Sequence, residues 1–211
     1  SGEGQAERYL DHLVSTVPGG LAGRRILVDC ANGAASFTAP KLFARFGLTV
    51  DFLHNDPNGL NINDHCGSTH LENLCAGVVQ GGYDLGIAFD GDADRCLAVD
   101  AAGNEVDGDK IMAICASRMQ QAGKLKNNGF VATIMSNIGL HKYAAAHQVK
   151  VLCAAVGDRN VLELMQKEGM ILGGEQSGHI IFLEHMTTGD GQLAALQLLQ
   201  ILCSSEQSLA E

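Results

Sequence analysis

The segment YDLGIAFDGDADR, residues 83–95, decides how the fold and the chemistry of this chain are interpreted. Its apolar first half is typical of a buried strand. Three aspartates follow at alternate positions, Asp90, Asp92 and Asp94, with only glycine and alanine between them. Because alternate residues of an extended loop point to the same side, we expect the three carboxylates to converge.

Converging carboxylates indicate a cation site, because they repel one another unless a positive ion lies among them. Oxygen ligands favour Mg²⁺ over zinc or copper, so Asp90, Asp92 and Asp94 are the predicted metal ligands. Arg95 follows directly. Its fixed positive charge would suit an anionic substrate or a phosphoryl group beside the metal.

Other aspartate motifs compete with this interpretation. An EF-hand calcium loop starting at Asp90 would need glycine at the position of Arg95 and glutamate at the position of Ala101, so it does not fit. A phosphatase of the haloacid dehalogenase type also carries aspartates after a strand and stays open as a weaker alternative. A polar turn that binds no metal is a further alternative.

Strand-like and helix-like segments alternate along the whole chain, which predicts the α/β class. We expect two consecutive α/β/α domains with mixed, largely parallel sheets, residues 1–106 and 107–211. The expected strands are 24–30, 48–53, 83–89, 130–135, 149–155, 170–175 and 178–184, with a hairpin turned at Gly103 and Asn104. The expected helices are 36–47, ended by Gly47, and 69–80, 108–123, 137–148, 158–169 and 190–205.

Composition limits the partners and the compartment. The 211 residues carry a formal net charge of -10, so we expect no binding to nucleic acid or to an anionic membrane surface. No stretch approaches the ~20 apolar residues of a membrane span. Seven cysteines without a CxxC pair predict a reduced, cytoplasmic protein. His54, His65 and His70 lie near Cys66, but their spacing fits no tetrahedral zinc pattern, and we expect no zinc there.

A second polar segment, ILGGEQSGHIIF at residues 171–182, sets Glu175, Ser177 and His179 at alternate positions after two glycines. An extended loop would present an acceptor, a hydroxyl and an imidazole to one ligand, and such convergent polar groups suit a sugar. A polar hairpin with a buried, hydrogen-bonded histidine explains the same pattern equally well.

Several separated strings resemble one enzyme family. FDGDADR (89–95) resembles the metal-binding loop of the α-D-phosphohexomutases, and GGEQSGH (173–179) resembles their sugar-specificity loop. GLNINDHCGSTH (59–70), IMSNIGL (134–140) and AAVGDRNVLELM (154–165) resemble further parts of their second and third domains. Gln176 and the downstream TTGDG (187–191) are similar to the phosphoglucosamine mutase branch. The similarity extends from residue 7 to residue 202.

The resemblance implies roles for the site residues. Asp90, Asp92 and Asp94 would hold one Mg²⁺, and Glu175 and Ser177 would hold adjacent sugar hydroxyls with His179 close by. The turn Gly157, Asp158, Arg159 would face the substrate cleft. A glycine turn that opens a helix does offer free N–H groups to an anion. An ordinary helix start with Asp158 as its N-cap is the alternative.

The resemblance also implies an activity, an isomerase that interconverts glucosamine 6-phosphate and glucosamine 1-phosphate. A phosphoserine would pass its phosphoryl group to the phosphosugar, glucosamine 1,6-bisphosphate would serve as intermediate and primer, and Arg95 would help to hold the serine phosphate. Family enzymes have four domains, with a TASHNP-like serine segment in the first and an RxSGTEP-like phosphate loop in the last. Neither string occurs here. We therefore expect the chain to correspond to domains two and three only, with the missing domains one and four as its partners, and to be inactive alone. A stand-alone, non-catalytic sugar-phosphate binding module is the alternative.

Overall fold

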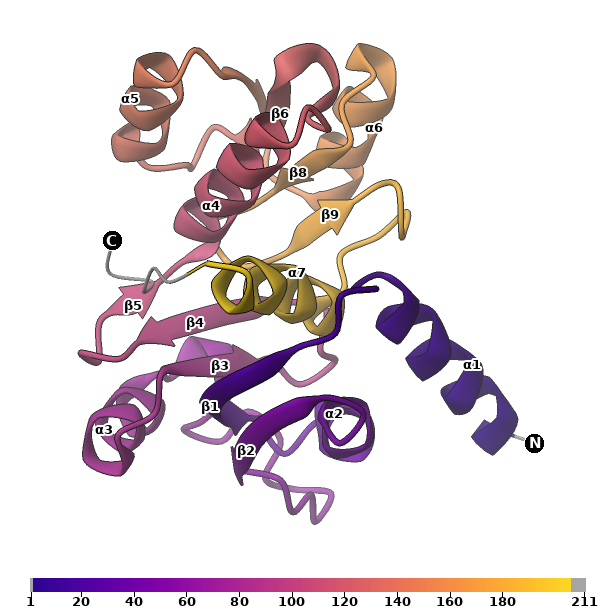
Figure 1. Cartoon of the computed structure of the whole chain (residues 1–211), viewed down its shortest axis with the longest axis vertical. Coiled ribbons are helices and arrows are strands. Elements are labelled where there is room, and N and C mark those ends of the chain that lie inside the picture. Colours follow the sequence, from indigo (N-terminus) through magenta and orange to yellow (C-terminus); the bar gives the residue numbers. More distant parts are fainter. Residues whose placement is uncertain (1, 206–211) are drawn as a thin grey trace.

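The computed structural model describes residues 2–205, so residue 1 and residues 206–211 at the ends of the two predicted domains lie outside the described part. Two α/β units lie one above the other (Figure 1). The first contains α1 (Gly2–Ser15), β1 (Ala22–Asp29), α2 (Ala35–Phe43), β2 (Gly47–Leu53), the 3₁₀ helix η1 (Gly67–Thr69), α3 (Glu72–Gly81), β3 (Leu85–Phe89), β4 (Cys96–Asp100) and β5 (Glu105–Val106).

The second unit begins two residues after β5. It contains α4 (Gly108–Gln121), the 3₁₀ helix η2 (Lys126–Asn128), β6 (Gly129–Thr133), α5 (Ile138–Ala146), β7 (Lys150–Ala154), α6 (Asp158–Glu168), β8 (Leu172–Gly174), β9 (Ile180–Phe182) and α7 (Gly191–Cys203). The predicted fold class is therefore confirmed.

The two sheets repeat one topology. The first has the strand order β2-β1-β3-β4-β5 and the second has the order β7-β6-β8-β9. In each sheet the first three strands along the chain are parallel, and the next strand pairs antiparallel with the third. Consequently β3 and β8 hold equivalent positions, and so do the loops that follow them.

Apolar side chains cover both faces of the first sheet. Every residue of β3 is buried, as expected for a central strand covered on both sides. On one face α3 packs through Leu74 and Val78 against Leu27 and Val99. On the other face α2 contributes Ala39 and Phe43 to the main core.

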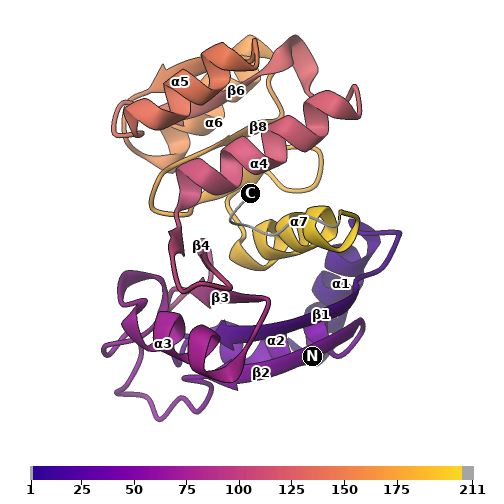
Figure 2. The same ribbon diagram turned by 60° about the vertical axis from the view of Figure 1, so that its left-hand side comes forward.

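The helix α7 belongs to the second half of the chain but lies between the two units (Figures 1 and 2). It is apolar almost all round, and Leu193, Leu196 and Leu199 are fully buried. These leucines share one core with strand residues of both sheets, such as Ile87 and Phe130. The units are thus joined by a continuous apolar core.

Two local expectations need correction, and one helix was missed. The helix predicted for 36–47 ends at Phe43, because Gly47 donates its N–H to Leu21 O at 2.9 Å and begins β2 instead. The strand predicted for 130–135 ends at Thr133. The helix α1 was not predicted. Among the described residues, no helix is long and apolar enough to cross a membrane.

Candidate functional site

The predicted metal loop, residues 90–94, lies where a doubly wound sheet most often binds its ligands. In the order β2-β1-β3 the chain crosses from one side of β1 to the other, which makes the boundary between β1 and β3 a topological switch point. Ligands of such sheets bind outside the carboxyl ends of the strands at this point. Asp90 follows directly after β3 and so lies at this edge.

A tight turn, not an extended loop, brings the three aspartates together. Ala93 has a φ of 63° and donates its N–H to Asp90 O at 3.1 Å. One carboxylate oxygen from each of Asp90, Asp92 and Asp94 lies within 4.8 Å of the other two. The expected convergence is present, but its physical cause is the left-handed residue at 93 and not the alternation along an extended strand.

Neighbouring backbone holds the turn in place. Gly91 O accepts the N–H of Ala34 at 2.8 Å, and a Cβ on Gly33 would collide with the Gly91 backbone. From the opposite side, Gly191 at the start of α7 donates its N–H to Ala93 O at 2.9 Å. Two segments far apart in the sequence therefore fix the metal loop.

The surroundings of Asp90 disfavour its negative charge. It is 8% exposed, and burial together with the charges of Asp94 and Asp92 raises its pKa to about 6. The N–H of Arg95 donates to Asp90 Oδ1 at 3.2 Å and opposes that shift. Arg95 Nε lies 3.7 Å from Asp90 Oδ2 and 3.9 Å from Asp94 Oδ1.

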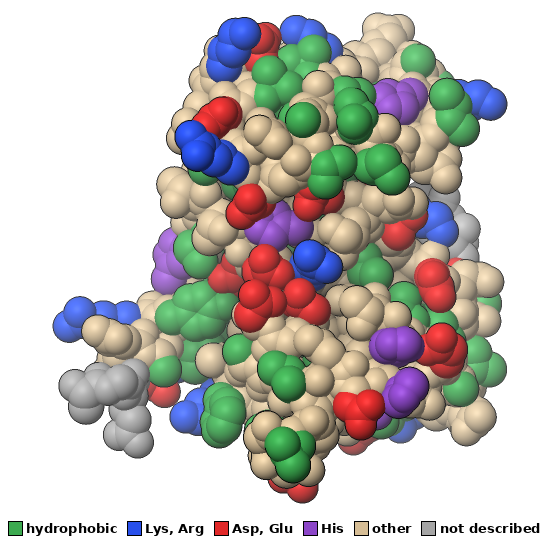
Figure 3. Space-filling model, turned by 180° about the vertical axis from the view of Figure 1, so that it is seen from behind, with side chains coloured by type: hydrophobic (Ala, Val, Ile, Leu, Met, Phe, Trp, Pro, Cys, Tyr) green, Lys and Arg blue, Asp and Glu red, His purple; other side chains and the backbone are tan. Residues whose placement is uncertain are grey.

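The cluster fits a hard divalent cation. It supplies carboxylate oxygens only, and Asp92 is exposed, so an ion could enter from solvent. Arg95 alone does not neutralise three carboxylates. Seen from behind the molecule, acidic side chains gather near the middle of the face, with basic and histidine side chains beside them (Figure 3).

The second polar loop follows β8, the strand equivalent to β3. It is also a turn, since Gly178 N–H donates to Glu175 O at 3.0 Å and Gly178 has a φ of 98°. The three predicted side chains therefore differ in their exposure and in their contacts. Glu175 is half-buried and accepts the Gly157 N–H at 2.9 Å, Ser177 is exposed, and His179 is buried.

The metal loop and this second loop form a direct backbone junction. Arg95 and His179 make an antiparallel bridge, in which the N–H of Cys96 donates to Gly178 O at 3.0 Å. His179 Nε2 lies 3.6 Å from Asp94 Oδ2. Within residues 2–205, the buried Nδ1 of His179 has no hydrogen-bond partner. The structure thus brings the metal loop, Arg95 and His179 into one site.

The third predicted segment opens α6. Gly157, with a φ of 119°, is the N-cap, so the alternative with Asp158 as N-cap is wrong. Asp158 accepts the N–H of Arg159 at 2.7 Å, and the exposed Arg159 pairs with Glu163 at 2.8 Å. This turn meets the second loop through Glu175, whereas Asp158 and Arg159 face solvent.

Sequence reasoning missed one part of the site. Asp190 is buried, caps α7 by accepting the N–H of Leu193 at 2.9 Å, and accepts the hydroxyl of Tyr9 at 2.9 Å. It therefore anchors both α1 and the start of α7, which supports the metal loop through Gly191. The available signal was an aspartate directly before an apolar helix, which is an N-cap pattern.

The two halves of the chain match two family models in succession. Residues 7–103 match the model described as phosphoglucomutase/phosphomannomutase, alpha/beta/alpha domain II, and residues 107–211 match the model of alpha/beta/alpha domain III. The chain belongs to the phosphoglucomutase/phosphomannomutase family, as the motif resemblance predicted.

Curated relatives agree with the predicted branch. The chain is 53% identical to the phosphoglucosamine mutase of Streptomyces griseus, over 97% of this chain and 45% of the relative. It is 54% identical to the phosphoglucosamine mutase of Moorella thermoacetica, over 97% of this chain and 46% of the relative. The chain thus spans about half the length of the curated relatives it matches.

Solved structures share the fold. A phosphoglucomutase/phosphomannomutase family protein of Burkholderia thailandensis has a TM-score of 0.85 at 25% identity, over 97% of this chain and 45% of that chain. The N-acetylphosphoglucosamine mutase of Aspergillus fumigatus, solved in complex with GlcNAc-6P and magnesium, has a TM-score of 0.75 at 19% identity. That match covers 97% of this chain and 51% of the fungal chain.

Proposed function

We propose that this chain is the metal-binding and sugar-binding part of a phosphoglucosamine mutase that interconverts glucosamine 6-phosphate and glucosamine 1-phosphate. The single observation that carries the proposal is the junction of the two loops. The carboxylate cluster and the second polar loop occupy equivalent places in the two sheets and meet through the Arg95–His179 bridge. One phosphosugar could therefore contact both loops at once.

The first loop is proposed to hold Mg²⁺ on Asp90, Asp92 and Asp94. Its all-oxygen donor set and the unneutralised charge of the cluster support this assignment. So does the magnesium in the fungal relative. When bound, the ion would neutralise negative charge on a phosphoryl group during transfer. Arg95, beside Asp90 and Asp94, would hold a phosphate oxygen from the same side.

The second loop is proposed to orient the sugar. Glu175 would accept a hydrogen bond from one hydroxyl and the exposed Ser177 would contact its neighbour. His179 has a buried Nδ1 without a partner in the described part of the chain, and its Nε2 lies near Asp94, so it would join the sugar site to the metal site. Gly157, Asp158 and Arg159 are proposed to contact the substrate phosphate at the start of α6.

The proposed reaction needs groups that these residues do not supply. The phosphoryl carrier would be a phosphoserine, and the intermediate would be glucosamine 1,6-bisphosphate, which also primes the enzyme. No serine in the 211 residues has a TASHNP-like context, and no RxSGTEP-like string is present. We therefore propose domains 1–106 and 107–211 as a binding half that does not turn over alone.

Mg²⁺ titration calorimetry on the chain tests the metal assignment. We expect binding that weakens at least about tenfold in Asp92→Asn, because this exposed ligand can be replaced without disturbing the fold. Glu72→Gln is the matched control, since Glu72 is an exposed carboxylate on α3 outside the cluster, and it should bind as the native chain does. Unchanged affinity in Asp92→Asn would contradict the assignment.

A mutase assay tests the activity. Glucosamine 1-phosphate, Mg²⁺ and a trace of bisphosphate are supplied to the chain and, separately, to a full-length relative such as that of Streptomyces griseus. We expect turnover by the relative alone. Turnover by the chain would show that the phosphoryl carrier lies within these residues. It would refute the proposal that these residues only bind metal and sugar.

A further inference from the structure

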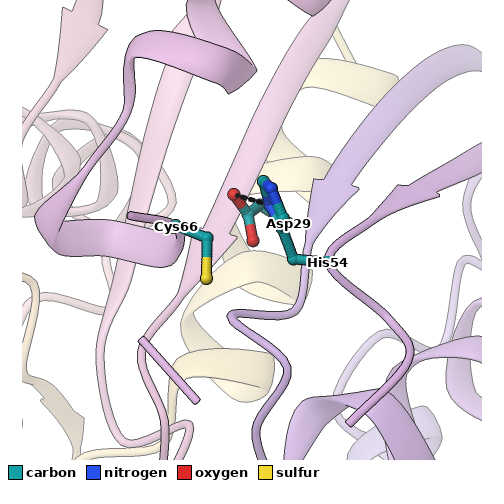
Figure 4. Close-up of side chains that lie close together, drawn as sticks. All are labelled: Asp29, His54 and Cys66. Carbon is teal, nitrogen blue, oxygen red and sulfur yellow. Dashed lines mark hydrogen bonds and ion pairs between the residues drawn. The ribbon is translucent and has the colours of Figure 1, made fainter. Parts of the chain in front are cut away.

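A second group of metal-binding side chains lies at the same edge of the first sheet. Asp29 is the last residue of β1, His54 directly follows β2, and Cys66 directly precedes η1. The three side chains lie close together (Figure 4), with one ligand atom of each within 4.8 Å of the other two. His54 Nδ1 is 2.9 Å from Asp29 Oδ2. None of these residues belongs to the metal loop or to the second polar loop.

The backbone around the group is held firmly. Asp29 Oδ1 accepts the N–H of Ala31 at 2.8 Å, and Asp29 Oδ2 accepts the N–H of Gly67 at 3.0 Å. His54 has a φ of 46°, a conformation that needs support in a non-glycine residue, and its carbonyl accepts the N–H of Asn32 at 2.7 Å. These contacts fix the carboxylate of Asp29 and the backbone of His54 without a metal.

Gly67 lets Cys66 approach the other two residues. It has a φ of 72°, and a Cβ at this position would lie 2.5 Å from both Ala31 Cβ and Phe89 O. Only glycine fits this close approach of the loop to the ends of β1 and β3. The thiol of Cys66 is thereby kept beside the carboxylate of Asp29.

The donor set differs in kind from the aspartate cluster. A thiolate, an imidazole and a carboxylate are zinc ligands, whereas Mg²⁺ prefers oxygen alone. Asp29 and Cys66 are fully buried, while the His54 side chain is 27% exposed, so one side of the group reaches solvent. An ionised Asp29 and a Cys66 thiolate would together match the charge of a divalent ion.

Metal binding would change the protonation of the thiol. Burial and the charge of Asp29 raise the pKa of Cys66, so the thiol is neutral in the metal-free chain and would release its proton to solvent as the sulfur binds the metal. Tetrahedral zinc with bonds of about 2.0–2.3 Å places its ligands roughly 3.3–3.8 Å apart. His54 Nδ1 and Asp29 Oδ2 lie only 2.9 Å apart, so zinc would replace the hydrogen bond between them and these two atoms would separate slightly.

We propose that Asp29, His54 and Cys66 form a separate site for a soft divalent cation such as Zn²⁺, with an open coordination position on the solvent side of His54. The spacing of histidines around Cys66 predicted no zinc because it could not include Asp29. His65 and His70 lie against each other, with ring centroids 5.4 Å apart, and neither joins the group.

The probe for this site is Cd²⁺, which gives an ultraviolet charge-transfer band when it binds a thiolate. Excess Mg²⁺ is added to occupy oxygen-only sites. All proteins carry Cys153→Ser, because the exposed Cys153 lies 3.9 Å from His141 Nε2 and forms a competing thiol–imidazole pair. In this background we expect the band to saturate at one equivalent of Cd²⁺ and Zn²⁺ to displace it.

Variants assign the ligands. Cys66→Ser should abolish the band, and His54→Asn, which tolerates the positive φ, should weaken Cd²⁺ binding by at least about tenfold. The matched control is Cys75→Ser, since Cys75 is a partly buried cysteine outside the group, and it should leave the band unchanged. Asp29 is not replaced, because its hydrogen bonds hold the surrounding loops.

Two further measurements keep the result decisive. Urea unfolding without metal verifies that each variant is folded. Thermal unfolding with and without zinc is the second measurement. Zinc should raise the melting temperature of the Cys153→Ser protein but not that of its Cys66→Ser derivative. The proposal is overturned if the Cys153→Ser protein gives no band, or if the band survives Cys66→Ser. It is also overturned if folded His54→Asn binds Cd²⁺ as tightly as its parent.

Discussion

Asp90 offers a direct test of the electrostatics of the metal loop, through the variant Asp90→Asn. Asparagine keeps the shape of the side chain and can still accept the N–H of Arg95 at Oδ1, but it carries no charge. Burial and two neighbouring carboxylates raise the pKa of Asp90 from 3.8 to about 6. Without metal, the native charge at this position therefore opposes folding at neutral pH.

The size and sign of the effect follow from linkage. One pKa unit corresponds to about 1.4 kcal/mol, so the shift corresponds to at most about 3 kcal/mol. The folded chain binds this proton more tightly than the unfolded chain, so its contribution to stability falls as pH rises from 3.8 to about 6 and is constant above. After screening by solvent and loss of the ion pair with the Arg95 side chain, Asp90→Asn should raise the free energy of unfolding at pH 8 by about 1–2 kcal/mol.

Urea unfolding at several pH values between 4 and 8, without metal, measures the effect. The difference between native chain and Asp90→Asn should be small at pH 4, should grow between pH 4 and about 6, and should level off at higher pH. Glu72→Gln is the matched control, because this carboxylate is exposed and lies outside the cluster. With Mg²⁺ the native chain should gain stability and Asp90→Asn should gain much less.

Two results would refute the reasoning about Asp90. One is an Asp90→Asn protein that is less stable than the native chain at pH 8 without metal. The other is a stability difference that does not change between pH 4 and pH 8. Either result would show that burial and the neighbouring carboxylates do not disfavour the charge of Asp90 as inferred.

Two further predictions concern the supports of the site. Gly33→Ala should destabilise the chain by about 1–3 kcal/mol and weaken Mg²⁺ binding, because the new Cβ collides with the Gly91 backbone. Urea unfolding measures the stability and calorimetry measures the Mg²⁺ affinity. Gly19→Ala is the control and should be near neutral, because nothing lies within 4 Å of a Cβ at that position. Glu175→Ala should cost about 1 kcal/mol and increase hydrogen exchange at the Gly157 amide, which donates to Glu175 at 2.9 Å; unchanged exchange there would contradict the proposed contact.

Most of the fold could be predicted because its signals are local. Apolar runs such as 83–89 and the periodic segment 158–169 correspond to β3 and α6 within a few residues. Errors occurred where tertiary pairing competes with local signals. Gly47 could end a helix, but its N–H bonds to Leu21 and it joins the sheet. The helix α1 was missed, and Tyr9 fixes it to Asp190 at the other end of the chain.

The sequence predicted the convergence of the three aspartates but not the geometry that produces it. The aspartates do converge, yet a left-handed Ala93 and supports from Ala34 and Gly191 produce the convergence. Nothing along the chain indicated that His179 would pair with Arg95. That junction depends on the relative placement of two sheets.

By itself, the sequence determined the α/β class, the order of the elements and the residue types at the strand ends, because periodicity and turn residues act over a few neighbouring positions. Only the tertiary structure decided which of those ends meet. It placed α7 between the two units, joined Arg95 to His179, and set Asp29 beside His54 and Cys66. Such contacts join residues far apart in the chain, and they depend on strand order and packing, which no local pattern contains.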